Sequence, residues 1–251
     1  MLCRIEKLKV VEKDELDKDK NKIMLNVVFL GQAGLLFDTE NIKILVDPYL
    51  SDSVAKIQPH NKRRQPIDER LLQMKPNIIV ITHNHADHLD KETLAHYLSE
   101  ESRVTILAPY SAWKELRTFG GLQNNYVMCN EGTTWTESGI IFRAVKAEHS
   151  DEYAIGIVIA VENKNYYVTG DTLYSERVFE SLPQIEFEAV FLPINGRGNN
   201  MNAADAARFA KRIGAKNVIP VHFGMFDDMT GGELQAKNAV VPKIYEEIKL
   251  Q

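Results

Sequence analysis

Short runs of apolar residues alternate with polar turns along this chain, and most of these runs are too short for a helix. β-branched residues dominate the run from Ile78 to Ile81, which Pro76 and Asn77 precede. Short β-branched runs bounded by turn residues predict buried strands. On this basis strands are predicted at residues 4–10, 24–30, 35–37, 42–46, 78–81, 104–107, 125–129, 133–136, 140–147, 153–161, 164–169, 189–192 and 218–221.

Longer stretches between these runs repeat apolar residues at helical spacing. Helices are predicted at residues 67–74, 91–98, 111–119, 175–181, 202–213 and 234–250, the last interrupted near Pro242. The expected caps are Asp90, Ser111 and Asn202 at helix N-termini and Gly214 at a C-terminus. The almost fully charged residues 12–22 are expected to form a solvated hairpin loop or a mobile tip. This order of elements suits helices that cover a pair of packed sheets.

Composition places the chain among globular proteins. Its 251 residues can form one large domain or two small ones, and a hydrophobic content of 44% is enough for a sizeable core. No apolar run approaches the roughly 18 residues of a membrane span, and the N-terminus lacks the apolar core of a secretion signal. Two distant cysteines, Cys3 and Cys129, suggest no disulfide framework, and Cys129 is a candidate for burial. We therefore expect a cytoplasmic protein. A net charge of −5 without a long basic stretch argues against a general nucleic-acid binder.

The segment from Thr82 to Asp90 is the most informative for function. His83, His85, Asp87 and His88 directly follow the predicted strand at 78–81, at the carboxyl end where open α/β sheets place their sites. Imidazole and carboxylate are the usual ligands of a catalytic divalent metal ion. In an extended loop His83 and His85 project to the same side, and Asp87 and His88 could reach a second ion. A lone histidine is usually a surface or core residue, but this spacing favours a metal site.

Three further candidate ligands each follow a predicted strand. They are His149 after 140–147, Asp171 after 164–169 and His222 after 218–221. Five of the seven histidines belong to this set, and the other two, His60 and His96, are expected to be surface residues.

The order His83-x-His85-x-Asp87-His88, then His149, Asp171 and His222, resembles the metallo-β-lactamase superfamily of metal-dependent hydrolases. All seven ligand positions of that family's dinuclear site find a match, and the resemblance spans nearly the whole chain. The resemblance implies one metal ion on His83, His85 and His149, a second on Asp87, His88 and His222, and Asp171 as the bridging ligand. It also implies an α/β (α+β) fold, a four-layer αββα sandwich, formed by one metallo-β-lactamase-like domain over residues 1–251 with two similar halves.

Two metal ions about 3.5–4 Å apart can hold a bridging water and lower its pKa towards neutrality, which gives hydroxide at physiological pH. One of the ions can polarise a carbonyl or phosphoryl oxygen. Asp87 could orient the hydroxide or carry a proton to the leaving group, which makes it the predicted catalytic residue. A mixed set of imidazole and carboxylate ligands accepts zinc, manganese or iron, so the ligands do not fix the metal.

Four segments are similar to the L-ascorbate-6-phosphate lactonase branch of the superfamily, namely Asp171 to Ser175, Gly196 to Gly198, Met201 to Asp205 and Val218 to His222. That branch opens a phosphorylated sugar-acid lactone in the cytoplasm and uses manganese. Its members form assemblies, so a homo-oligomer stays open here. The chain is shorter than the bacterial lactonase and lacks its insertions, which leaves the exact substrate open. The segment from Thr82 to Asp90, with the basic loop before it, also resembles the N-acyl-phosphatidylethanolamine phospholipase D branch. A phosphodiesterase or phospholipase on the same fold is therefore the alternative.

Arg197 is the predicted contact for a small anionic substrate. Arginine binds phosphate through a bidentate fork, and its glycine neighbours would let a substrate approach the backbone. An arginine exposed on a turn explains it equally well. Tyr174 could donate a hydrogen bond to a substrate oxygen, although packing is an equally good explanation. Lys62, Arg63 and Arg64 could steer an anion towards the site, but a solvated basic loop is the preferred interpretation.

A metal-binding regulatory protein without enzymatic activity is the third hypothesis. The full ligand set argues against it, because a purely structural zinc site is normally closed and four-coordinate. A lipid substrate would need an apolar entrance or an amphipathic surface helix. The last predicted helix carries Val241, Ile244, Tyr245 and Ile248 at a spacing that resembles an ordinary core-facing stripe. We therefore expect a soluble substrate and no membrane span.

Overall fold

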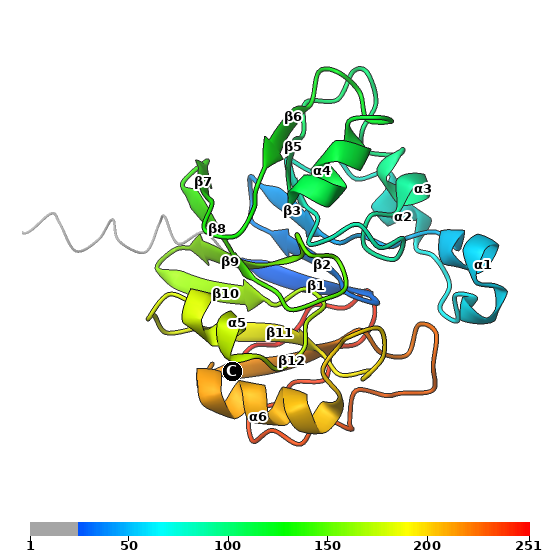
Figure 1. Ribbon diagram of the computed structural model, residues 1–251. Helices are drawn as coiled ribbons and strands as arrows, with labels where there is room; N and C mark the ends of the chain where they lie inside the picture. Colours follow the sequence, from blue (N-terminus) through cyan, green and yellow to red (C-terminus); the bar gives the residue numbers. More distant parts are fainter. Residues whose placement is uncertain (1–24) are drawn as a thin grey trace, which may run out of the picture.

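The computed structural model describes residues 25–251, in which two six-stranded sheets pack face to face with helices outside them (Figure 1). The predicted strand at 4–10, the charged residues 12–22 and Cys3 lie outside the described residues. No helix within the described range is long and apolar enough to cross a membrane.

The first sheet contains strands from the N-terminal half of the chain in sequence order. The first three strands pair antiparallel, and the later neighbours pair in parallel. The strands are β1 (Asn26–Gly31), β2 (Gly34–Asp38), β3 (Lys43–Val46), β4 (Ile78–Val80), β5 (Thr105–Ala108) and β6 (Asn125–Met128).

The second sheet follows the same plan in the C-terminal half. Its first four strands pair antiparallel, and its last three pair in parallel. The strands are β7 (Thr134–Glu137), β8 (Ile140–Lys146), β9 (Ile155–Val161), β10 (Lys164–Val168), β11 (Ala189–Pro193) and β12 (Asn217–Val221). Each strand predicted between residues 24 and 221 is confirmed in position.

Short helices connect the strands, and only the last is longer than two turns. They are α1 (Ser53–Ile57), the 3₁₀ helix η1 (Pro59–Asn61), α2 (Glu69–Leu72), α3 (Lys91–Leu94), α4 (Tyr110–Leu116), α5 (Glu176–Ser181) and α6 (Ala203–Ile213). The predicted caps Asp90 and Asn202 are confirmed, because their side chains accept hydrogen bonds from the backbone N–H groups of Glu92 and Asp205. Gly214 ends α6 in the left-handed conformation, as predicted.

Alternating side chains of the strands form the core between the sheets. On β9, Ile155, Ile157 and Ile159 point into this core, whereas Val158 points to the opposite face of the sheet. Cys129 is also buried between the sheets, as predicted. The period of two follows from the pleat of a strand, and it lets each sheet bury both of its faces.

The outer faces of the two sheets are covered by helices. Ile79 of β4 belongs to a buried cluster with Leu94 and Leu116, from α3 and α4. Val190 of β11 belongs to another with Phe209 of α6. Full burial of one such side chain stabilises the fold by about 1.5–3 kcal/mol. The four layers confirm the predicted αββα sandwich.

The prediction of a helix at 234–250 was wrong. This segment runs extended along both sheets: Val240 N donates to Val218 O at 2.9 Å, and Ile248 N donates to Val27 O at 2.7 Å. Pro242 lacks a backbone N–H and disfavours helical geometry in the residue before it. The open edges at β1 and β12 also offer unpaired backbone groups. The apolar residue Ile248 is buried as its spacing indicated, but beside a strand edge.

Three details near the other helices also differ from the predictions. Regular helix in the predicted span 91–98 ends at Leu94, and turns follow it. Ser111 is not a cap, because α4 begins one residue earlier and Ser111 Oγ donates to Asp151 Oδ2 at 2.5 Å. The helix α1 was not predicted, because five residues are too few to show a period.

Candidate metal centre

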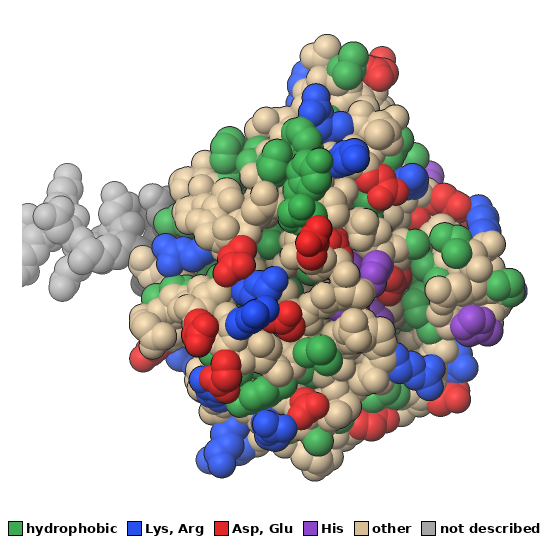
Figure 2. Space-filling model, in the orientation of Figure 1, with side chains coloured by type: hydrophobic (Ala, Val, Ile, Leu, Met, Phe, Trp, Pro, Cys, Tyr) green, Lys and Arg blue, Asp and Glu red, His purple; other side chains and the backbone are tan. Residues whose placement is uncertain are grey.

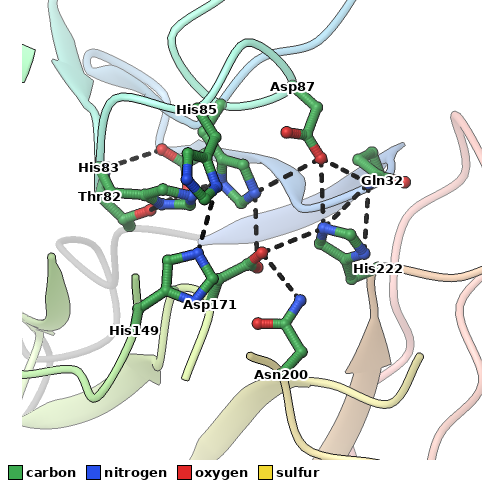
Figure 3. A network of polar contacts seen from close by, with 12 residues as sticks. Gln32, Thr82, His83, His85, Asp87, His149, Asp171, Asn200 and His222 are labelled. Atoms are coloured by element: carbon green, nitrogen blue, oxygen red, sulfur yellow. Dashed lines mark hydrogen bonds and ion pairs between the residues drawn. The ribbon is translucent and has the colours of Figure 1, made fainter. Parts of the chain in front are cut away.

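Seven histidine and aspartate side chains converge where strands of both sheets end (Figure 3). The loop after β4 supplies four of them, and the segments after β8, β10 and β12 supply the others. All seven residues predicted as metal ligands are therefore brought together. They are His83, His85, Asp87, His88, His149, Asp171 and His222.

The first group contains His83, His85 and His149, whose donor atoms lie within 4.8 Å of one another. His149 Nε2 lies 3.2 Å from His85 Nδ1, and His149 Nδ1 donates to the carbonyl oxygen of Asn199 at 3.2 Å. Because the proton of His149 sits on Nδ1, the lone pair of Nε2 points towards His85. This group is the one predicted to hold a first metal ion.

The second group contains Asp87, His88 and His222, again with donor atoms within 4.8 Å. Asp171 contacts two members of this group. Its Oδ1 lies 3.4 Å from His88 Nε2, and its Oδ2 lies 3.2 Å from His222 Nε2. Asp171 also groups with His83 and His88. Its carboxylate therefore lies against both groups, where a bridging ligand is predicted.

Two imidazole nitrogens of the centre are buried and lack a hydrogen bond within the described residues. His83 Nε2 and His88 Nε2 make no hydrogen bond with any residue in the described part of the chain. An unsatisfied buried polar atom costs about 1–3 kcal/mol. These nitrogens face other imidazoles and carboxylates, the donor types that divalent zinc, manganese and iron accept. The orphaned atoms and the donor set together fit bound divalent ions.

Asp47 lies outside the predicted ligand set, yet it orients part of it. Its fully buried carboxylate accepts hydrogen bonds from Thr82 N at 2.8 Å, Thr82 Oγ1 at 2.6 Å and His88 Nδ1 at 2.8 Å. Because the proton of His88 sits on Nδ1, Nε2 is free to act as a ligand. The available signal was the position of Asp47 directly after β3, which runs parallel to β4.

Carboxamides hold the carboxylates in place. Gln32 Nε2 donates to Asp87 Oδ2 at 2.7 Å, and Asn200 Nδ2 donates to Asp171 Oδ2 at 2.8 Å (Figure 3). The backbone carbonyl of Gln32 also accepts a hydrogen bond from His222 N at 2.6 Å. Such donors favour the ionised carboxylates. The sequence gives no local signal for Gln32, which lies in the turn between β1 and β2.

Three residues of the centre have strained backbone conformations. Gln32, Asp47 and His222 have φ values of 53°, 43° and 59°. This left-handed region costs a residue other than glycine about 1–3 kcal/mol and persists only where surrounding contacts impose it. All three residues touch the predicted ligands or are one of them, so the strain positions side chains of the centre.

Burial and neighbouring charges shift the pKa values of several side chains in the centre. Burial lowers the pKa of His83 well below its ordinary value. Burial opposes a charge on His88 and His222 as well, but the neighbouring carboxylates together outweigh it, with Asp171 the largest of them. The pKa of His88 is raised well above its ordinary value, and that of His222 is raised to about 10. Burial works against ionisation of Asp87 too, yet the nearby imidazoles hold its pKa below the usual range. Metal binding must therefore displace protons from imidazoles.

The centre opens into a cavity of about 610 Å³. Histidine side chains lie inside a hollow between the body of the molecule and the lobe that carries α1 (Figure 2). The cavity has six carboxamide residues in its wall, which are Gln32, Gln58, Asn61, Asn84, Asn195 and Asn200. Arg197 is the one lysine or arginine among its lining residues. Its guanidinium makes no hydrogen bond or ion pair with residues 25–251. The structure thus places Arg197 where an anionic substrate could reach it, and the contact itself stays a prediction.

Tyr174 lies outside this cavity wall. Its ring packs edge-on against Phe179, with centroids 5.2 Å apart, and the guanidinium of Arg208 lies 4.4 Å from its ring centroid. These contacts support packing, and none of them supports a contact with substrate.

The three basic residues at 62–64 do not form one solvated cluster. Arg63 is buried, and its guanidinium donates to the carbonyl oxygen of Tyr49 and to the hydroxyl of Tyr245, both at 2.7 Å. Arg64 pairs with Asp228, and Lys62 is exposed. Arg63 therefore joins the loop after β3 to the C-terminal segment, and none of the three lines the main cavity. His60 and His96 are exposed, as predicted.

Comparison with known proteins agrees with this geometry. A UPF0173 metal-dependent hydrolase of Listeria welshimeri is 28% identical over 215 residues, which cover 80% of this chain and 86% of that protein. Another, from Thermoplasma acidophilum, is 29% identical over 192 residues, covering 73% and 77% of the two chains.

Solved structures show the same fold at low identity. A possible metal-dependent hydrolase of Veillonella parvula has a TM-score of 0.70 at 18% identity, covering 91% of this chain and 100% of that one. An isothiocyanate hydrolase from Delia radicum gut bacteria has a TM-score of 0.70 at 17% identity, covering 89% and 98%. Residues 43–223, well over half of the chain, match the family model described as the beta-lactamase superfamily domain. The chain therefore belongs to the metallo-β-lactamase superfamily of hydrolases.

Proposed function

We propose that this protein is a hydrolase that depends on two divalent metal ions and opens a small anionic lactone or ester. A phosphorylated sugar-acid lactone such as L-ascorbate 6-phosphate is the first substrate to test. The observation that carries the metal dependence is a pair of buried nitrogens, His83 Nε2 and His88 Nε2, which lack hydrogen bonds within residues 25–251 and lie among five further imidazole and carboxylate side chains. Arg197, whose guanidinium is unpaired within residues 25–251, lies in the cavity wall and supports the anionic substrate.

His83, His85 and His149 would hold one ion, Asp87, His88 and His222 the other, and Asp171 would contact both. Divalent ions held there supply Lewis acidity and lower the pKa of water. Manganese, zinc and iron all suit these ligands.

Individual side chains of the protein have separate roles in the hydrolysis. Water adds to the carbonyl carbon of the lactone, the ring C–O bond breaks, and the products are an alcohol and a carboxylic acid that releases its proton to solvent. Asp87 accepts the proton released by the water and delivers it to the departing ring oxygen. Gln32 holds Asp87 in place through the hydrogen bond of 2.7 Å to Oδ2. Arg197 binds the anionic group of the substrate, and the carboxamides of the wall bind its hydroxyl groups.

A phosphodiesterase, such as an N-acyl-phosphatidylethanolamine phospholipase D-like enzyme, is the second candidate function. The observation that favours it is the side chain of Ile57, which is 69% exposed and lines the same cavity. A lipid substrate requires an apolar entrance of this kind.

Turnover of L-ascorbate 6-phosphate by metal-loaded protein tests the first proposal, with Asp87→Asn as the control. We expect ring opening by the unsubstituted protein and loss of turnover in Asp87→Asn, with folding retained. Turnover that survives near the original level in Asp87→Asn would contradict the catalytic role of this residue. Hydrolysis of phosphodiesters without ring opening would select the second candidate.

Arg197→Ala tests the anion contact. We expect it to raise KM for the phosphorylated substrate much more than for its dephosphorylated analogue. Arg70→Ala is the matched control, because Arg70 is exposed, pairs with Asp68 and lies outside the cavity. Equal effects of Arg197→Ala on both substrates would remove Arg197 from the anion-binding role.

A further inference from the structure

One wall of the cavity is apolar. Val54, Ile57, Ala86 and Phe226 line it. Hydrophobic side chains lie along the α1 side of the hollow that contains the histidines (Figure 2). Three of the four belong to, or pack against, a small apolar cluster centred on Tyr49, separate from the clusters that build the sheets.

This apolar cluster fixes the position of the wall. Val54 is buried beside Tyr49 and Met225, and the ring of Phe226 packs edge-on against Tyr49 with centroids 5.7 Å apart. The inner part of the wall is therefore anchored by packing, whereas Ile57 at the end of α1 stays 69% exposed.

Polar contacts hold α1 on its other side. Ser53 Oγ donates to Asp90 Oδ1 at 2.9 Å, and Lys56 pairs with Glu92. Asp90 is the N-cap of α3, so these contacts attach α1 to the start of that helix. Polar side chains of α1 make these contacts, whereas its apolar residues Val54 and Ile57 line the cavity.

Single exposed apolar residues are common and usually need no explanation. Leu122, Ile141 and Ile185 are such residues in the described part of the chain, and none of them lines the cavity. Ile57 differs because it extends an anchored apolar wall inside the cavity that contains the candidate metal centre. A substrate with an apolar group, bound in this cavity, would cover the exposed side chain of Ile57.

We propose that Val54, Ile57 and Phe226 form a subsite for an alkyl or aryl group of the substrate. This inference rests on the proposed hydrolase function and narrows its substrate class to amphiphilic anions: an ester or lactone with an anionic group near Arg197 and an apolar group on the α1 wall. A sugar-acid lactone carries no such group, so it would use only the polar part of the cavity. Ile57 is then a specificity-determining residue.

Binding of n-alkyl phosphates from methyl to hexyl phosphate, measured by calorimetry on the zinc-loaded protein, tests the subsite. Each added methylene that reaches the wall lowers Kd by about two- to fourfold, as expected for burial of a CH₂ group. Ile57→Ser flattens this dependence on chain length, and Ile57→Leu restores it. Ile185→Ser is the matched control, because Ile185 is 42% exposed outside the cavity, and it leaves the dependence unchanged.

Arg197→Gln distinguishes binding of the phosphate group from binding of the alkyl chain. It raises Kd for every alkyl phosphate by a similar factor and keeps the dependence on chain length. A Kd that does not change with chain length in the unsubstituted protein overturns the apolar subsite, as does a dependence that survives in Ile57→Ser. Neither result bears on the proposed hydrolase function. That proposal is contradicted by a different result, in which alkyl phosphates bind but no Asp87-dependent turnover is found.

Discussion

The hydrogen bonds of Asp47 predict a measurable role for a residue that is not itself a ligand. Its buried carboxylate accepts three hydrogen bonds, and the one from His88 Nδ1 leaves His88 Nε2 free to bind a metal ion. In Asp47→Asn one oxygen remains to accept from Thr82 N. The new NH₂ group would face two former donors, Thr82 Oγ1 and His88 Nδ1.

The expected cost of Asp47→Asn follows from these contacts. A hydrogen bond to a charged group is worth about 1.5–3 kcal/mol and a neutral one about 0.5–1.5 kcal/mol. All three bonds lose their charged acceptor, so the metal-free protein should lose about 3 kcal/mol of unfolding free energy. His88 must also move its proton to Nε2 to accept from the new amide, which should weaken metal binding by about 10- to 100-fold.

Urea denaturation measures the first effect, and competition with a chromophoric chelator measures the second. Asp90→Asn is the matched control, because Asp90 is also a buried carboxylate that accepts from Ser53, Thr93 and Glu92 but touches no predicted ligand. It should cost a similar unfolding free energy and leave metal affinity within a few fold. If Asp47→Asn weakens metal binding no more than Asp90→Asn does, then Asp47 does not orient His88.

Three further predictions follow from other parts of the structure. Gln32→Leu removes the donor to Asp87 Oδ2, so a metal titration should show weaker binding of one ion and unchanged binding of the other; equal weakening of both would contradict this. The pKa of His222 is raised to about 10 in the metal-free fold, so protonation of this imidazole stabilises that fold. The stabilisation is fully present below the ordinary pKa of about 6.5 and is lost as the pH rises through 10. Apparent metal affinity should accordingly rise about tenfold per pH unit for each proton displaced across this window, and calorimetry in buffers of different ionisation enthalpy should detect the released protons; affinity that does not change with pH would refute the protonated centre. Ile248→Ala should lower the unfolding free energy by about 2 kcal/mol or more, because this side chain is 5% exposed in the core between the sheets; an unchanged urea midpoint would show that the C-terminal segment does not contribute to that core.

Much of the fold could be predicted because its strands depend on local patterns. The β-branched runs identified β4 and β9, and the period of two placed their side chains. The prediction of a helix at 234–250 was wrong because the spacing of apolar residues indicates that they are buried, but does not indicate which part of the fold they pack against. Ile248 is buried by backbone pairing with Val27, a contact between the two ends of the described chain that no local window contains.

The candidate centre also has one part that the sequence predicts and another part that only the folded structure shows. Its seven ligand residues were predicted because histidine and aspartate follow strand ends, where a sheet gathers side chains from distant parts of the sequence. Asp47 and Gln32 were missed because their roles arise only from contacts with His88 and Asp87 in the folded protein. Arg63 was expected in a solvated loop, because a basic triplet in the sequence gives no sign that its middle member is buried and donates a hydrogen bond to Tyr245.

Metal content tests the central claim, a centre for two ions built from these seven side chains. After loading with zinc and dialysis, elemental analysis should find about two equivalents per chain. His83→Ala and His222→Ala, one from each group, should each lose about one equivalent while remaining folded. Less than one equivalent in the unsubstituted protein, or two equivalents retained in both variants, would contradict the proposed centre.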